Sequence, residues 1–558
     1  MSSNSASGII NVERESAFRG SYKRVAEVTS SYAEWRYWWL LFALLLLMYL
    51  GNVCYLSLEQ GEEVIIAGVA RTMLESGDYF VPRLNGRIFL EYPPLYYYLE
   101  CLSFRWFGFT AFAAKLPSIL AAVVGAHMLY YLLRAMKTSP FTAFLSSLIL
   151  ATSVQYFSCG LYNCVDTLLV LFCIMSWLGF YSWSVKEQKR KRLLFFTLLV
   201  AGLAGCSLTR NWQGMLIPLS GIIFYMAADD LIQRNFRLER YIMVFFAALL
   251  ALIPYFCYCR FLYTEFGWDT LLELLRQNNY DRLMLSGREP EYLYDAGGLF
   301  QPWLIFLFIA VVFHLRRVVR KHAVNSLYSL CILFVPLVWL SYAAGGQHIF
   351  LLPLYAPAAI LTGVMFGMFA EGKIVKFTNN MNDFIIKVSF YIIFGLGLIA
   401  PVAFIIAGVC LGLPGFGRYW AAVLMFILTL RVLSLVKPRH EERLLWYLAV
   451  IFALIYPNIS GIVLAERSVG NTLDGMFAGL ESKPGRIYLY SPDETLAGAA
   501  AFYLGQERIA ETGAEGMVHP GDIVIAPLRY MNPVRWDVRE YLNKYMVAER
   551  LGEKEIAE

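Results

Sequence analysis

The chain has 558 residues, of which 58% are hydrophobic, 16% aromatic and only 16% charged. Soluble domains carry about a quarter charged residues, so this composition excludes an ordinary soluble protein and predicts a polytopic membrane protein. The formal net charge of +5 is small for this length and gives no support to nucleic-acid binding.

Apolar windows of about 20 residues predict the membrane spans, because that length crosses the hydrocarbon core. A tail of residues 1–36 precedes the first window, which is interpreted as a retained helix. Thirteen spans are predicted, at 37–57, 111–133, 139–157, 163–183, 193–209, 212–228, 241–262, 298–315, 326–343, 349–369, 384–411, 419–436 and 444–465. The predicted fold class is therefore an all-α membrane bundle over residues 37–465.

Positive charge predicts the orientation, because cytoplasmic connections are enriched in Lys and Arg. The N-terminal tail is basic, and every second connection after it is basic, from Arg134 and Lys137 onward to Lys437 and Arg439. The N-terminus is therefore expected in the cytoplasm and the C-terminal region outside. This orientation places three larger segments outside: 58–110, 263–297 and 466–558.

The outer segments have recognisable local patterns. An amphipathic helix is predicted from Glu63 to Glu75, and Pro93-Pro94 must end any helix before a second, aromatic-rich one at Leu95–Trp106. Residues 466–558 are expected to form a small α/β domain, with strands at Arg486–Tyr490 and Asp522–Ala526 and helices near 493–504 and 533–546. Cys159 and Cys164 are close enough in sequence to pair, but free thiols are favoured.

Acidic residues at the outer ends of spans are candidates for chemistry, because carboxylates are costly to bury in a membrane bundle. Glu62 and Glu63 follow the first span, and Asp166 stands at the outer end of the fourth. A solvated helix N-terminus, where acids are stabilised by the helix dipole, is the alternative for the glutamates. A helix cap with one hydrogen bond is the alternative for Asp166.

Basic and polar residues at the same face extend the candidate site. Arg210 follows a glycine-rich span and either extends to the interface or binds a phosphate through its planar fork. The loop Arg276–Arg282 is rich in hydrogen-bond donors, with a polar surface loop as the alternative. His348 lies in another outward connection, where a structural role is favoured. No His, Cys and acidic residues have zinc spacing, so no metal ligands are predicted.

The first outer loop resembles the GT-C membrane glycosyltransferases, in particular the branch with lipid A aminoarabinose transferase and the bacterial relatives of protein O-mannosyltransferases. The family pattern is an acidic pair, an Ala-x-x-Ala-Arg-x-Met-Leu-x-Ser-Gly-Asp run, Val-Pro-x-Leu-Asn-Gly, and Glu-Lys-Pro-Pro-Leu. The corresponding segments here are Glu62-Glu63, Ala67–Asp78, Val81–Gly86 and Glu91–Leu95. Weaker similarities are Asp166, Leu208–Arg210, Asn278–Arg282 and Leu352–Pro357.

Two departures limit what the resemblance implies. Glu62 replaces the usual Asp, and Tyr92 replaces the Lys that is taken to hold the lipid phosphate in aminoarabinose transferases. A tyrosine donates a hydrogen bond but carries no positive charge at neutral pH. Neutralisation of a phosphate would then depend on arginines, among which the candidates are Arg83, Arg87, Arg210, Arg276 and Arg282. The aminoarabinose substrate is therefore not carried over.

The resemblance implies an inverting glycosyltransferase at the outer face of the bacterial inner membrane. It would move a sugar from a polyprenyl (undecaprenyl) phosphate to a lipid, glycan or protein acceptor. Glu62 is the expected base or acceptor-orienting carboxylate and Asp166 a second acid near the sugar. Expected substrate-binding residues are Glu63, Arg83, Glu91, Tyr92, Arg210, Asn279, Arg282 and His348. Whether a divalent cation is needed stays open.

Two other functions fit the same pattern. A transporter or flippase of a lipid-linked sugar would use the outward acids for ion coupling, but transporters commonly contain internal repeats, and none is found here. A glycan polymerase or ligase on the same fold would differ only in its acceptor.

Overall fold

The computed structural model describes most of the N-terminal two thirds of the chain and parts of the C-terminal region. The described residues are 34–50, 58, 61–184, 191–275, 300–343, 348–371, 487–490, 492–512, 522–527, 536–542 and 545–550, with scattered residues between 399 and 480. The predicted spans at 384–411, 419–436 and 444–465 lie essentially outside these residues, so the count of thirteen stays a prediction.

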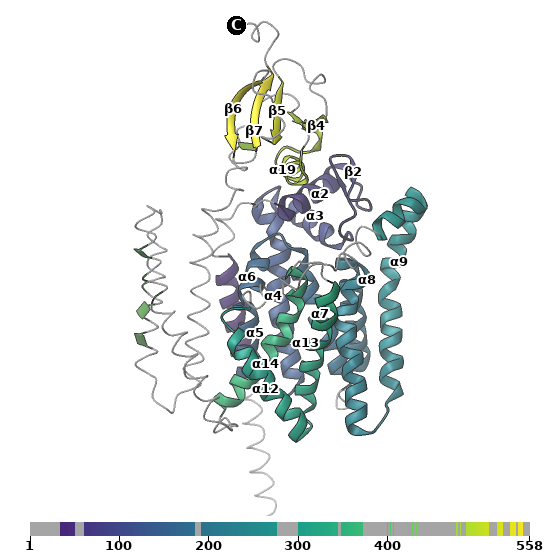
Figure 1. Cartoon of the computed structure of the whole chain (residues 1–558), viewed down its shortest axis with the longest axis vertical. Coiled ribbons are helices and arrows are strands. Elements are labelled where there is room, and N and C mark those ends of the chain that lie inside the picture. The colour runs from purple at the N-terminus through teal and green to yellow at the C-terminus, as the bar shows by residue number, and fades with distance from the viewer. Residues whose placement is uncertain are drawn as a thin grey trace, which may run out of the picture.

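Long apolar helices form a bundle (Figure 1), and the chain is a multi-pass membrane protein. Six helices of the described residues are long and apolar enough to cross a membrane, or seven if α5 and α6, bent by 68°, form one span. The bundle consists of a helix at 34–50, α4 (Ala111–Ala135), α5 (Pro140–Ala151), α6 (Val154–Leu161), α7 (Val165–Ser184), α8 (Arg192–Gln233), α9 (Leu238–Leu275), α12 (Leu304–Lys321), α13 (Val324–Ala343), the 3₁₀ helix η3 (His348–Leu354) and α14 (Tyr355–Ala370).

The helix α8 contains two of the predicted spans, 193–209 and 212–228, on either side of a sharp break. Arg210 and Asn211 leave helical geometry, with φ/ψ of −133°/39° and 57°/−169°. A Cβ on Gly214 would lie only 2.5 Å from the carbonyl oxygen of Cys206, so the chain reverses direction there. Arg210 consequently stands at the turn, as the charge pattern predicts.

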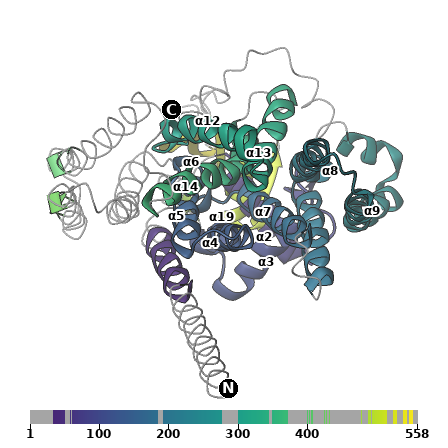
Figure 2. The same cartoon turned by 90° about the horizontal axis from the view of Figure 1, so that it is seen from below.

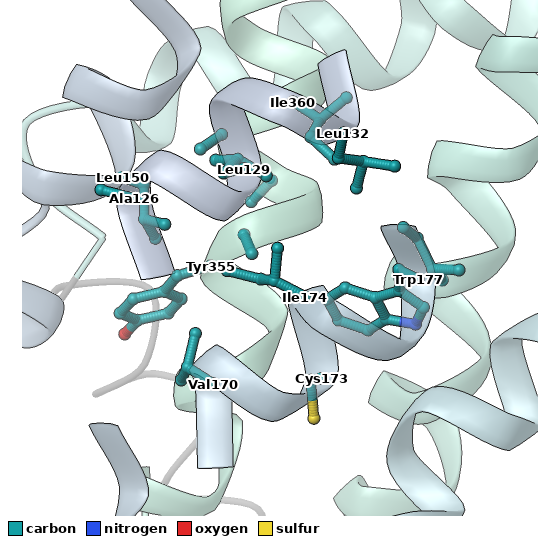
Figure 3. Close-up of a cluster of buried hydrophobic side chains, with 14 of the residues drawn as sticks. Ala126, Leu129, Leu132, Leu150, Val170, Cys173, Ile174, Trp177, Tyr355 and Ile360 are labelled. Carbon is teal, nitrogen blue, oxygen red and sulfur yellow. The ribbon is translucent and has the colours of Figure 1, made fainter. Parts of the chain in front are cut away.

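The core of the bundle lies between α4, α5, α7 and α14 (Figure 3). α7 is apolar all round, and nearly all of its side chains are buried, including Trp177. A helix with no polar face must be surrounded by other helices. In the view from below, α7 accordingly lies inside the bundle and α9 at its periphery (Figure 2).

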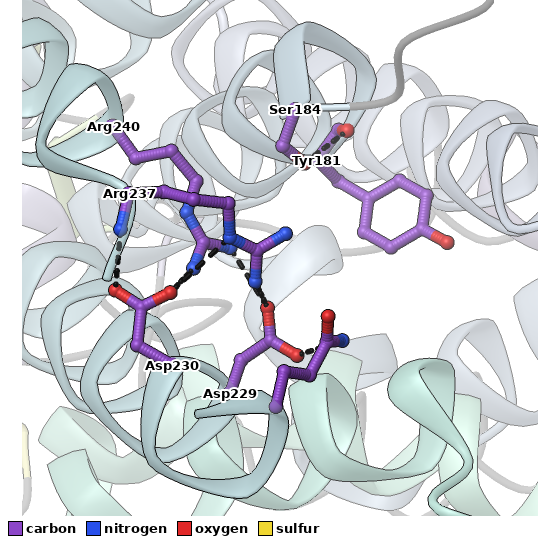
Figure 4. Close-up of polar contacts among 7 residues, drawn as sticks. Tyr181, Ser184, Asp229, Asp230, Arg237 and Arg240 are labelled. Atoms are coloured by element: carbon purple, nitrogen blue, oxygen red, sulfur yellow. Dashed lines mark hydrogen bonds and ion pairs between the residues drawn. The ribbon is translucent and has the colours of Figure 1, made fainter. Parts of the chain in front are cut away.

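The end of the bundle away from the C-terminal sheet is tied by charges between α8 and α9 (Figure 4). Arg240 donates to Asp229 at 2.9 Å, and Arg237 donates to Asp230 at 3.2 Å. Each arginine also contacts the other aspartate. All four groups therefore have oppositely charged partners, and these ion pairs hold α8 and α9 together.

Two short helices and a hairpin cover the opposite end of the bundle. They are α2 (Glu62–Ser76), β1 (Arg83–Leu84), β2 (Arg87–Ile88) and α3 (Leu95–Phe107), which confirms both helices predicted in the first outer loop. Asn85 and Gly86 join the two strands with φ of 49° and 81°. Positive φ at both central residues is the geometry that makes Asn-Gly a preferred hairpin turn.

The C-terminal region contains a five-stranded sheet of order β4-β3-β5-β7-β6. Its elements are β3 (Ile487–Tyr490), α19 (Glu494–Leu504), β4 (Ile509–Thr512), β5 (Ile523–Pro527), β6 (Trp536–Leu542) and β7 (Tyr545–Arg550). The strands predicted at Arg486–Tyr490 and Asp522–Ala526 and the helix near 493–504 are confirmed. The helix predicted near 533–546 is wrong, because antiparallel pairing of β6 with β7 overrides the local helical preference.

The helices α19 and α2 pack directly against each other (Figure 1). Their backbones approach closely at Gly68 and Gly498, where a Cβ on Gly68 would lie 2.6 Å from the oxygen of Gly498. Arg71 of α2 also donates to the carbonyl of Phe502 at 2.5 Å. Most of α2 is therefore buried, and the alternative of a solvated helix N-terminus is wrong for Glu63, because the helix is covered on several sides.

We expect Gly498→Val to destabilise this contact, because the new side chain would overlap the backbone of Ile65, 2.7 Å from the position of its Cβ. Overpacking of this kind costs about 1–3 kcal/mol. Thermal unfolding and limited proteolysis of the purified protein would measure the effect. Thr495→Val, at a partly exposed position of the same helix, is the matched control, and equal midpoints for the two variants would contradict the close contact.

Candidate active site

The acidic pair opens α2, and its two carboxylates lie in different environments. Gly61 precedes them with φ of 94°, a conformation that favours glycine. Glu62 is exposed, whereas Glu63 is buried, with 6% of its surface accessible. The pair therefore divides into one carboxylate that reaches solvent and one that belongs to the interior.

Glu63 is held by residues from the connection between α6 and α7 and from α4. Its Oε1 accepts from the backbone N–H of Asn163 at 2.7 Å, and its carbonyl accepts from the Asn163 side chain at 3.1 Å. Lys115, fully buried in α4, has its Nζ 3.7 Å from the same carboxylate oxygen. A buried carboxylate with a cation and hydrogen bonds is stable in place, so Glu63 fixes the start of α2 to the bundle.

The same network continues into α3. Asn163 donates to Glu100 Oε1 at 2.8 Å and accepts from the Tyr96 hydroxyl at 2.7 Å. Glu100 is fully buried, and burial raises the pKa of its carboxyl well above the usual range. Sequence analysis missed Glu100, Lys115 and Asn163. Glu100 and Lys115 could have been identified from the sequence, because each is a charged residue inside an apolar stretch.

A second group of residues includes Glu62 and lies around the ring of Tyr92. The Tyr92 hydroxyl donates to Glu62, and the guanidinium carbon of Arg210 lies 4.8 Å from the centre of the Tyr92 ring. This geometry is a cation–π contact, which is strengthened by desolvation. Tyr92 therefore links an exposed carboxylate to a buried cation.

Asp166 completes this group by pairing with Arg210. Arg210 donates from Nε to Asp166 Oδ1 at 2.8 Å and from Nη2 to Oδ2 at 2.5 Å. Their side chains are only 8% and 1% exposed. A two-point contact of this kind fixes the guanidinium plane, so Asp166 orients Arg210 against the Tyr92 ring.

The backbone beside Arg210 is strained. Asn211 combines a φ of 57° with a ψ of −169°, a region that is almost restricted to glycine. Such conformations persist where the surrounding structure imposes them, and they cluster at functional sites. Here the strain accompanies the chain reversal that brings Arg210 to Asp166 and Tyr92.

The Tyr92 hydroxyl stays protonated at physiological pH. Burial raises the pKa of Tyr92 well above its usual value, and Glu62 and Glu91 act in the same direction, while Arg210 opposes the shift. A protonated phenol donates its hydrogen bond to the Glu62 carboxylate. Tyr92 therefore contributes a neutral donor at a position between Glu62 and Arg210.

The other predicted site residues lie elsewhere or outside the described part of the chain. Arg83 lies 3.9 Å from Asp78 and over the Phe266 ring, and Glu91 is half-buried beside Tyr92. Asn279 and Arg282 lie outside the described residues, as does the side chain of His348, although its backbone begins η3. Among the described residues no group of three or more His, Cys, Asp and Glu side chains could hold a metal ion.

Comparisons with known proteins relate the chain to one family. A family model described as dolichyl-phosphate-mannose-protein mannosyltransferase matches residues 91–258. The "undecaprenyl phosphate-alpha-4-amino-4-deoxy-L-arabinose arabinosyl transferase" of Erwinia tasmaniensis is 24% identical over 314 residues, which cover 55% of this chain and 55% of that protein. An uncharacterized protein of Aquifex aeolicus is 25% identical over 57% of this chain and 61% of its own length.

The fold has a solved counterpart. The crystal structure of ArnT from Cupriavidus metallidurans bound to undecaprenyl phosphate matches with a TM-score of 0.69 and 15% identity, over 92% of this chain and 98% of that one. The sequence alignments with the curated relatives span only 55% and 61% of the relatives' lengths, whereas the likeness of fold covers nearly the whole chain. Together these likenesses agree with the resemblance to GT-C membrane glycosyltransferases that the first outer loop predicts.

Proposed function

We propose that this protein transfers a sugar from a polyprenyl phosphate donor to an acceptor of the bacterial envelope, at the outer face of the inner membrane. The observation that carries the proposal is the group Glu62–Tyr92–Arg210–Asp166, in which an exposed carboxylate and a desolvated guanidinium meet at one aromatic ring. The proposed orientation has residues 1–36 in the cytoplasm, the bundle over 37–465 and residues 466–558 outside.

Arg210 is the proposed phosphate-stabilising cation. When the bond between the anomeric carbon and the phosphate oxygen breaks, negative charge grows on the departing polyprenyl phosphate. A fixed cation in a water-poor site stabilises that charge more than one in water. Since position 92 is a tyrosine, the positive charge that relatives are expected to carry there comes in this chain from Arg210, stacked on its ring.

Glu62 is the proposed base or acceptor-orienting group. An acceptor oxygen attacks the anomeric carbon from the side opposite the phosphate, the C–O bond to phosphate breaks, and the configuration inverts. Where the acceptor is a hydroxyl, its proton passes to the carboxylate. Glu62 fits this role because it is exposed and its carboxylate is positioned by Tyr92. Asp166 acts on the reaction through Arg210, as a positioning residue.

We expect Glu62→Gln to lower transfer by roughly 10²-fold or more while the protein still folds, because the amide keeps the shape but cannot accept a proton. Mass spectrometry of envelope lipids, glycans and exported proteins from cells with the wild type, no copy, or the variant would measure the effect. A sugar-sized mass should disappear with deletion and with Glu62→Gln.

The matched control is Glu75→Gln on the same helix, where the carboxylate forms a surface pair with Arg71 at 2.6 Å. This variant should retain the modification, because surface pairs contribute little. Full modification in Glu62→Gln cells would remove Glu62 from the mechanism.

A further inference from the structure

A polar cavity of about 230 Å³ lies at the end of the bundle away from the proposed active site. The turn after α4, the start of α5, and parts of α12, α13 and α14 form its wall. Charged wall residues are Lys137, Arg317 and Glu371, and apolar wall residues are Ile360, Val364 and Met368. The wall therefore combines charged groups with aliphatic ones.

Hydrogen bonds within the protein hold the polar wall in place. The Glu371 carboxylate accepts from the hydroxyls of Ser139 and Thr142, the latter at 2.9 Å. His314 is buried, with Nδ1 2.8 Å from the Ser326 hydroxyl and Nε2 3.1 Å from the Leu361 carbonyl. The cavity is consequently preformed, which lowers the cost of binding.

Arg317 is the residue of this wall that is best suited to bind an anion. Its guanidinium is half-buried, and its contacts are the sulfur of Met368 at 2.9 Å and the Phe313 ring at 5.7 Å. Within the described part of the chain no carboxylate lies in ion-pairing distance of Arg317. A partly desolvated guanidinium without a carboxylate is a favourable place for a phosphate, whose oxygens match its fork.

The surroundings favour a lipid as the source of that phosphate. Exposed Arg316, Arg320 and Lys321 continue the basic surface at the end of α12, and basic pockets between membrane helices on the cytoplasmic side bind anionic headgroups. The aliphatic residues of the wall suit the carbon atoms of a lipid better than a bare ion. We propose that this cavity binds the phosphate of an anionic phospholipid from the adjacent leaflet, with Arg317 as its principal contact. This proposal does not depend on the proposed transferase activity.

The test is native mass spectrometry of the full-length protein with phosphatidylglycerol, with zwitterionic phosphatidylcholine, and with inorganic phosphate as a competitor. Phosphatidylglycerol should be retained preferentially, and Arg317→Gln should weaken its binding about tenfold, since hydrogen bonds to charged groups are strong. Lys137→Gln should weaken binding less, and it provides a second variant if Arg317→Gln fails to fold. Millimolar inorganic phosphate should not displace the lipid.

Arg320→Gln removes the same charge from an exposed position of the same helix outside the cavity wall, and it should change binding less than about twofold. Equal losses in Arg317→Gln and Arg320→Gln would overturn the proposal in favour of general surface attraction. Displacement of the lipid by inorganic phosphate would assign the site to a free anion and overturn the lipid as its occupant. Unchanged lipid binding in both Arg317→Gln and Lys137→Gln would exclude this cavity as the binding site.

Discussion

Arg210→Gln is expected both to abolish sugar transfer and to destabilise the protein. The substitution leaves Asp166, with 1% of its side chain exposed, as a buried carboxylate without its guanidinium partner. Breaking a buried pair from one side costs about 3–5 kcal/mol. Thermal unfolding in detergent would measure the loss of stability, and the envelope mass assay would measure the loss of transfer.

The double variant Asp166→Asn/Arg210→Gln separates the two effects. Removing both charges of a buried pair is far less costly than removing one, so stability should return toward that of the wild type. Transfer should stay lost, because the cation beside Tyr92 is still absent. Arg192→Gln, which disrupts a surface pair with Glu239 at the start of α8, is the matched control. A double variant that is stable and fully active would exclude Arg210 as the phosphate-stabilising cation.

Lys115→Met is expected to be the second strongly destabilising change, for the same physical reason at a different place. It removes the ammonium 3.7 Å from the buried Glu63 carboxylate, to which the backbone N–H of Asn163 still donates. The expected cost is again about 3–5 kcal/mol. Because Glu63 fixes the start of α2, transfer should fall with stability and in proportion to it.

Adding Glu63→Gln to Lys115→Met should recover much of the stability, since the amide can still accept from the Asn163 backbone N–H. Thermal unfolding of the single and double variants gives the coupling between the two sites. Lys321→Met, at an exposed position, is the control for loss of one positive charge. Additive effects of Lys115→Met and Glu63→Gln would contradict an energetic pairing of the two groups.

The sequence predicts this fold well where a single local pattern suffices. The apolar windows place α4, α7 and α13, and the double proline places the start of α3 at Leu95. The isolated charge of Arg210 between two apolar stretches predicts the reversal within α8. These features depend on segments of about 20 residues, within which hydrophobicity and turn chemistry agree.

Contacts between distant segments could not be predicted in the same way. Glu63 belongs to the interior because Lys115 and Asn163 come from two other parts of the chain and α19 covers its helix. The group Glu62–Tyr92–Arg210–Asp166 likewise joins four separate segments. The sequence identifies each of these residues as a candidate, but the division into a structural glutamate and an exposed one requires the packed structure.

The most direct measurement is the fate of the donor bond in vesicles containing the purified protein and a sugar-charged polyprenyl phosphate extract, with envelope lipids as acceptors. A glycosyltransferase releases polyprenyl phosphate and places the sugar on an acceptor, and we predict this release for the wild type and its loss in Glu62→Gln. Movement of the intact sugar lipid across the membrane, with the sugar–phosphate bond unbroken, would contradict the account and establish a transporter.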